Sequence, residues 1–128
     1  MKEDEDIVAV YTKKEDIQTI INKLKTHSFE ELTKRDHYYF SLSTKNTDET
    51  EIVNMYPHFE KIELIMKRKR KDGRTNYDIF YGTEDGSFIL YAVNLDTVPP
   101  SLINAYPTNR NLKQFKKFVI KKYWNQMI

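Results

Sequence analysis

The chain contains no cysteine, which excludes disulfide bonds, thiol catalysis and thiolate metal sites together. Its three histidines, His27, His37 and His58, do not have the HxxxH spacing, which argues against a zinc site. No apolar run approaches the length of a membrane span, and the acidic start MKEDED is unlike a signal peptide. These absences predict a cytoplasmic protein that works without a metal, without another cofactor and without a membrane partner.

Acidic residues are absent between Thr97 and Ile128. Residues 1–64 carry 9 Lys or Arg against 14 Asp or Glu, a net charge of −5. Residues 65–128 carry 12 against 5, a net charge of +7. A basic half favours a polyanionic partner, of which nucleic acid is the commonest. The charge pattern alone does not distinguish this reading from mutual neutralisation of the two halves.

The length of 128 residues predicts a single domain, residues 1–128, with one core. Its first half predicts a strand at 7–11 and a helix at 13–26, in which Ile17, Ile20, Ile21 and Leu24 share one face. A capping pattern at Ser28 and Glu31 predicts a second, short helix. We expect the aromatic residues 35–43 to be extended and residues 48–56 to form another helix.

Two turn signals dominate the second half, Lys71-Asp72-Gly73-Arg74 and Glu84-Asp85-Gly86-Ser87. Asp-Gly between runs of β-branched and aromatic residues indicates a hairpin, because glycine reaches positive φ without a steric penalty. We therefore predict four successive strands between Glu60 and Pro107 and a lysine-rich helix at 110–125. The fold class predicted is α+β: a four-stranded antiparallel β-meander packed against N-terminal helices and a C-terminal basic helix.

Six cations surround the first turn, Lys67 to Lys71 and Arg74, and they would suit contacts with phosphate groups. The alternative is a solvated hairpin tip whose charges keep a sheet edge from aggregating. The final helix adds further cations. The candidate RNA-binding residues are Arg68, Lys69, Arg70, Lys71, Arg110, Lys113 and Lys117.

His37 lies beside Arg35, Tyr38 and Tyr39. A histidine beside a cation and hydroxyl groups can act as a general acid or base in RNA strand cleavage. The alternative is a structural histidine, which is the commoner role.

Asn104, Tyr106 and Thr108 would project from one face of the last strand, where polar groups can bind a phosphate or stack on a base. The alternative is that Tyr106 packs over the final helix.

With its strand Ile103-Asn104-Ala105-Tyr106-Pro107-Thr108, the chain resembles the barnase, EndoU, colicin and RelE group of ribonuclease toxins, whose sheets often end in a similar TAYP-like strand. The resemblance implies metal-independent cleavage of RNA through activation of the 2′-hydroxyl, and it implies RNA and a cognate inhibitor protein as partners. The site residues it implies are His37 as base or acid with Arg35 beside it, Arg74 or Arg68 as phosphate clamp, and Tyr106 and Thr108 as positioning groups.

Two functions follow as hypotheses. The first is a metal-independent RNA-cleaving toxin or phage-type ribonuclease of RelE-like fold. The second is a non-catalytic binding or inhibitor protein, phage-encoded or RNA-binding, that uses the same basic surface. A nuclease requires His37, a cation and Thr108 to converge on one face of the sheet, whereas a binding module requires only the positive patch.

Overall fold

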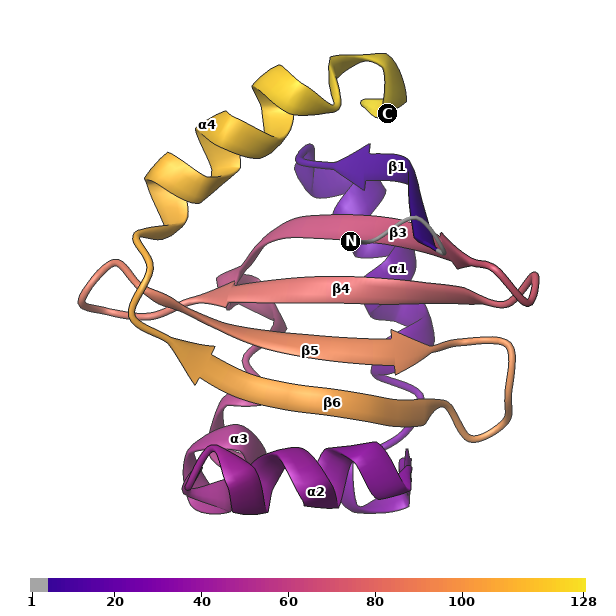
Figure 1. Cartoon of the computed structure of the whole chain (residues 1–128), viewed down its shortest axis with the longest axis vertical. Helices are drawn as coiled ribbons and strands as arrows, with labels where there is room; N and C mark the ends of the chain where they lie inside the picture. Colours follow the sequence, from indigo (N-terminus) through magenta and orange to yellow (C-terminus); the bar gives the residue numbers. More distant parts are fainter. Residues whose placement is uncertain (1–4) are drawn as a thin grey trace.

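A computed structural model of the chain describes residues 5–128, so most of the acidic start lies outside the described residues. The α+β class is confirmed: the described part contains one mixed sheet and four helices (Figure 1). None of these helices is both long and apolar enough to cross a membrane.

The sheet has six strands in the order β1-β3-β4-β5-β6-β2. Each of the first five strands in this order pairs antiparallel with its neighbour, and the two-residue β2 lies parallel to β6. The predicted sheet was therefore too small, because β1 and β2 extend it at both edges and β2 makes it mixed. The strands are β1 Glu5–Tyr11, β2 Thr33–Lys34, β3 Ile62–Arg70, β4 Thr75–Gly82, β5 Phe88–Asn94 and β6 Ser101–Thr108.

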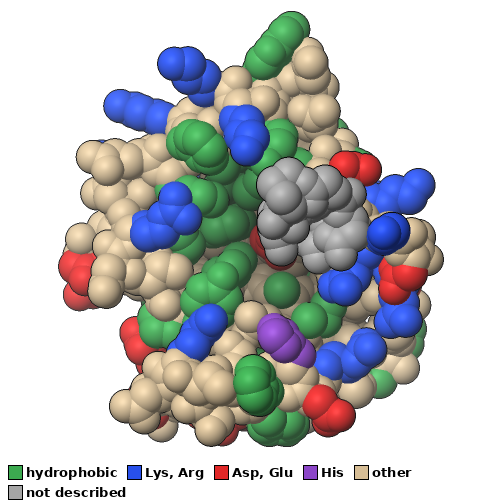
Figure 2. All heavy atoms as spheres, in the orientation of Figure 1, with side chains coloured by type: hydrophobic (Ala, Val, Ile, Leu, Met, Phe, Trp, Pro, Cys, Tyr) green, Lys and Arg blue, Asp and Glu red, His purple; other side chains and the backbone are tan. Residues whose placement is uncertain are grey.

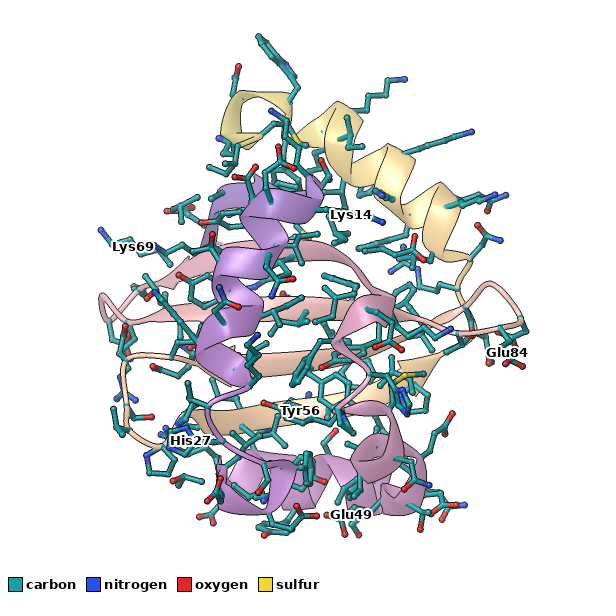
Figure 3. All side chains as sticks on the ribbon, turned by 180° about the vertical axis from the view of Figure 1, so that it is seen from behind. Lys14, His27, Glu49, Tyr56, Lys69 and Glu84 are labelled. Carbon is teal, nitrogen blue, oxygen red and sulfur yellow. The ribbon has the colours of Figure 1, made fainter. Side chains whose placement is uncertain are left out.

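The helices lie on both faces and along one edge of this sheet. Helix α1 crosses its rear face, which Figure 3 shows from behind, and α2 runs beside β6 (Figure 1). Helix α4 packs on the front face, where Leu112 and Val119 are buried. The helices are α1 Lys14–Leu24, α2 Asp36–Thr44, α3 Glu49–Met55 and α4 Leu112–Lys122, with 3-10 turns at Phe29–Glu31, Phe59–Lys61 and Trp124–Gln126.

The alternation of the strands builds two cores. On the rear face, Ile65, Ile79 and Tyr91 pack with the apolar stripe of α1. On the front face, Met66 and Phe80 pack with α4 in a smaller cluster. This second core occupies only part of the front face. Beside it, Arg68 and Arg70 of β3 are partly exposed, whereas Asn76 and Asp78 of β4 are buried.

Residues 35–43 are the main correction to the predicted elements, since they form helix α2 and not an extended segment. Aromatic residues favour strands through packing, and here that packing is available to a helix. Tyr38 and Ser41, three residues apart, turn the same buried face toward the sheet. The Tyr38 hydroxyl donates to Glu49 Oε2 at 2.8 Å, which ties α2 to α3.

Both glycines of the predicted turns have positive φ, 90° at Gly73 and 88° at Gly86, as their turn signals required. The basic first turn and the acidic second turn lie at opposite ends of the sheet, as the positions of Lys69 and Glu84 show (Figure 3). The two turns therefore present opposite charges at the two ends of the molecule.

Candidate functional site

A hollow of about 370 Å³ lies where the start of α2 meets the β3–β4 hairpin. We call it the histidine–arginine hollow. It brings together the predicted catalytic residues Arg35, His37 and Arg74, from two distant parts of the sequence. The predicted RNA-binding residue Arg70 also lines it. Its lining is Arg35, Asp36, His37, Arg70, Asp72, Arg74, Asn76, Asn94 and Ile103. In Figure 2 the Lys and Arg side chains gather along the side of the molecule where this hairpin lies.

The short parallel pair of β2 and β6 holds the start of α2 in this place. Thr33 N donates to Pro100 O, and Arg35 N donates to Leu102 O, both at 3.0 Å. Helix α2 begins immediately afterwards, so Arg35 and His37 are presented at the end of the sheet beside the hairpin. Backbone hydrogen bonds thus position the two side chains, which are themselves exposed.

His37 lies at the surface of the hollow, and its ring stacks near Phe40 with 6.5 Å between ring centroids. Arg74 Nε lies 3.2 Å from Asp72 Oδ2, and both side chains are about half exposed. An exposed ion pair of this kind is weak, so an incoming phosphate can compete for the Arg74 guanidinium. The three arginines outnumber the two aspartates of the lining, which leaves the hollow positive.

Asn76 supplies the one buried polar atom of the hollow that has no partner among residues 5–128. The residue is 5% exposed, and its Oδ1 accepts no hydrogen bond. A buried acceptor without a donor costs roughly 1–3 kcal/mol, so such atoms are rare unless a ligand or water completes them. The position of Asn76 therefore suits a water molecule or a ligand group that donates a hydrogen bond.

Tyr106 and Thr108 line a different hollow, so the structure does not bring them to His37. This second hollow, about 350 Å³, lies between the front of the sheet and α4. Burial raises the pKa of Tyr106, and Lys45 Nζ lies 4.6 Å from the centroid of its ring. The Thr108 hydroxyl donates to Phe88 O at 3.4 Å and accepts from Arg110 N at 3.3 Å. Thr108 thus acts in the local backbone structure.

The other predicted cations divide between three places. Arg68 faces the second hollow, where its Nε donates to Asp78 Oδ2 at 3.0 Å. The Arg110 guanidinium covers the Phe115 ring at 4.6 Å. The remaining candidates are exposed or half-buried: Lys69, Arg70 and Lys71 on the hairpin, and Lys113 and Lys117 on α4.

A third hollow, of about 780 Å³, lies between α3 and the β4–β5 turn. Its acidic side chains, Glu51, Glu84 and Asp85, repel a phosphate. Hydrogen bonds from Thr83 and Ser87 lower the pKa of Asp85 to about 2. His58, on the same rim, lies 3.4 Å from Glu60. Within the described residues, no group of three His, Asp or Glu side chains could hold a metal ion.

The sequence reading missed Asn76, Asn94 and Ile103 as parts of the site. Alternation along β4 does place Asn76 on the face of Asp78 and Phe80, so a signal existed for its direction. Its burial depends on the neighbouring strands and carried no local signal. No protein-family model matches the chain, and neither the curated proteins nor the solved structures show a significant similarity to it. Its function has to be inferred from the chemistry of the site.

Proposed function

We propose that the protein is a metal-independent endoribonuclease with a RelE-like arrangement of its sheet, and that the histidine–arginine hollow binds the scissile phosphodiester. The observation that carries the proposal is the convergence of His37 with Arg35 and Arg74 in one positive hollow. Cations there neutralise the phosphate, and the imidazole of a histidine can exchange a proton with the substrate.

In the proposed reaction the 2′-oxygen of the ribose attacks the adjacent phosphorus. A bond from O2′ to phosphorus forms and the bond from phosphorus to O5′ breaks, which leaves a 2′,3′-cyclic phosphate and a 5′-hydroxyl. His37 accepts the proton of the 2′-hydroxyl, and the leaving O5′ takes a proton from water. The hydroxide that remains takes the proton from His37, which returns the histidine to its starting state. Arg35 and Arg74 stabilise the charge on the phosphoryl oxygens.

The orphan acceptor of Asn76 fits this substrate. A 2′-hydroxyl is a hydrogen-bond donor that RNA has and DNA lacks. In the bound substrate Oδ1 of Asn76 accepts from this hydroxyl, so the buried atom gains its missing partner and the nucleophile is held beside the phosphate. The hydroxyl has one proton, so it turns from Asn76 to His37 when the proton is transferred. Asp72 is a poorer base, because it already accepts from Arg74 N at 3.0 Å and lies 3.2 Å from Arg74 Nε.

A ribonuclease of this kind would act as a toxin on RNA in the cytoplasm, and its host would need a cognate inhibitor protein. Such an inhibitor would be acidic, because it has to cover a positive hollow and exclude a polyanion.

The second candidate is an RNA-binding protein without catalysis. It is favoured by the setting of His37: among residues 5–128 no carboxylate binds its ring, which rests near Phe40 instead. Catalytic histidines are commonly oriented by such a group.

The test is to incubate the purified protein with total RNA and transfer RNA in EDTA and to resolve the products on a denaturing gel. We expect discrete fragments with the wild type, none with His37→Ala, and about 10–100-fold slower cleavage with Arg35→Ala or Arg74→Ala. Lys121→Ala is the control and should cleave at the wild-type rate, because it removes an exposed cation of α4 that lines neither hollow and is not a candidate RNA-binding residue. Intact RNA with a salt-sensitive shift on a native gel would establish the binding protein, and intact RNA without a shift would overturn both functions.

A further inference from the structure

The second hollow, between the front of the sheet and α4, has the chemistry of a site for a nucleobase. We call it the aromatic groove. Its floor is closed, because Phe115 of α4 packs on the buried rings of Phe80 and Phe88, with 5.3 and 5.4 Å between ring centroids. At its rim Phe118 is 53% exposed. Figure 2 shows hydrophobic side chains at the surface between α4 and the sheet.

Cations flank these rings on two sides. Arg110 covers Phe115 from the start of α4, and Lys45 covers Tyr106 from the end of α2. These two ring faces are therefore occupied, and the ring that the groove offers to a base is Phe118, which is 53% exposed. Single-stranded nucleic acid commonly binds where bases stack on exposed rings and nearby cations follow the phosphates. A volume of about 350 Å³ is at the lower end of the range for small-ligand pockets.

The groove adjoins the histidine–arginine hollow along the same two strands. Asn76 of the hollow and Asp78 of the groove lie two residues apart on one face of β4, so about 7 Å separates them along the strand. Arg70 and Arg68 have the same relation on β3. A strand whose phosphate occupies the hollow therefore has a neighbouring base within reach of the groove.

We propose that the aromatic groove is a base-binding subsite for single-stranded RNA, occupied by the nucleobase next to the phosphate held in the histidine–arginine hollow. This inference rests on the proposed function, because it takes RNA as the ligand. Helix α4 packs on the sheet beside the exposed Phe118 ring, so only a base that has left a duplex can lay its face on this ring. The substrate class that follows is unpaired RNA: loops, ends and single strands.

The test compares two probes of equal length, both labelled with a fluorophore and both uncleavable because the riboses are 2′-O-methylated. One is a single-stranded hexanucleotide and the other is its abasic counterpart, which carries the same phosphates without bases. Anisotropy titrations give both affinities for the wild type, for Phe118→Ser and for Ile120→Ser. Ile120 is the matched control, since it is an exposed apolar residue of α4 outside the groove.

We expect the wild type to bind the hexanucleotide at least tenfold more tightly than the abasic probe. Phe118→Ser should weaken hexanucleotide binding about tenfold, as expected for the loss of one base–aromatic stack, and leave abasic binding unchanged. Ile120→Ser should leave both unchanged. Equal affinity of the wild type for the two probes, or equal effects of the two variants, would overturn the subsite while leaving the phosphate hollow intact. The methylated riboses lack the 2′-hydroxyl that Asn76 is proposed to bind, so unmodified RNA of the same sequence is titrated against His37→Ala in parallel. Binding of neither probe and of no unmodified RNA would overturn the proposed function itself.

Discussion

Arg68 on β3 and Asp78 on the neighbouring β4 form an ion pair inside the aromatic groove, with Arg68 Nε donating to Asp78 Oδ2 at 3.0 Å. Arg68 Nη2 donates to the same oxygen, and Asp78 is 7% exposed. The carboxylate neutralises the arginine locally. The phosphate clamp of the proposed site is therefore Arg74 with Arg35, and Arg68 serves the structure of the groove.

Asp78→Ala should destabilise the fold strongly, because it leaves the Arg68 guanidinium without its carboxylate. Breaking a buried pair costs about 3–5 kcal/mol, and the partial exposure of Arg68 places the expected loss nearer 2–3 kcal/mol. Urea unfolding followed by circular dichroism measures the difference. Glu84→Ala, at an exposed turn, is the control and should change stability by less than about 0.5 kcal/mol.

Replacing both residues shows whether the stability lost in Asp78→Ala comes from the unpaired charge of Arg68 or from other contacts of Asp78. The double variant Arg68→Met/Asp78→Leu should recover most of the loss, because neither charge is then left alone in the groove. A double variant as unstable as Asp78→Ala would show that the Asp78 carboxylate stabilises something other than Arg68.

Two buried tyrosines should make the stability of the fold decrease at alkaline pH. Tyr81 Oη donates to Tyr56 O at 2.7 Å and Tyr91 Oη to Ile52 O at 2.6 Å, and burial raises the pKa of both hydroxyls well above 10. Because the folded state holds these protons more tightly, its stability is complete below the unfolded pKa of about 10 and falls as the pH rises above it. Unfolding at pH values from about 8 to 11.5 measures this slope.

Tyr91→Phe distinguishes this cause from general alkaline damage. It should lower stability at pH 8 by about 1 kcal/mol, because Ile52 O loses a donor, and it should reduce the slope above pH 10. Tyr39→Phe, at a residue that is 55% exposed, should change neither value. An unchanged slope in Tyr91→Phe would contradict the assignment.

Local signals accounted for α1 and for both hairpin turns, where periodicity and glycine act within a few residues. They failed at α2, because aromatic residues such as Tyr38 are common in strands. The contacts that bury Tyr38 come from residues that are distant in the sequence. It is fully buried, and its hydroxyl binds Glu49. Tertiary packing against β6 selected the helix there, and propensity alone could not show it.

The sequence predicted several residues of the candidate site, but it did not predict how these residues come together in space. Arg35 and His37 are neighbours in the sequence, but their approach to Arg74 depends on two residues of β2 pairing with β6. A strand of two residues is too short to show the alternation of apolar and polar side chains that predicts a strand. Alternation did place Tyr106 and Thr108 on one face, yet their distance from His37 is a property of the whole sheet.

Asp85 predicts an acid-dependent loss of stability at the β4–β5 turn. Hydrogen bonds from Thr83 Oγ1, Ser87 Oγ and Ser87 N lower its pKa to about 2. A lowered pKa means that its contribution is complete above the unfolded pKa of about 4 and is lost as the pH falls toward 2. Thermal unfolding at several pH values between about 5 and 2 should show a smaller decline in Asp85→Asn than in the wild type. Equal declines would refute the assignment.

The Asn76 side chain should contribute to RNA binding and not to the stability of the fold. Its buried Oδ1 has no donor, so Asn76→Val removes an unsatisfied atom and suits a β-strand, and we expect stability to stay equal or rise by up to about 1 kcal/mol. Affinity for single-stranded RNA should fall about threefold to tenfold with the loss of one hydrogen bond to the 2′-hydroxyl.

The control is another asparagine of the same hollow. Asn94 Oδ1 accepts from Asp96 N at 2.7 Å, so Asn94→Val should lose about 1 kcal/mol of stability, the reverse of the effect at Asn76. Urea unfolding and RNA titration of both variants give the two quantities side by side. If Asn76→Val loses more than about 2 kcal/mol, Asn76 serves the fold and the hollow loses its strongest indication of a ligand.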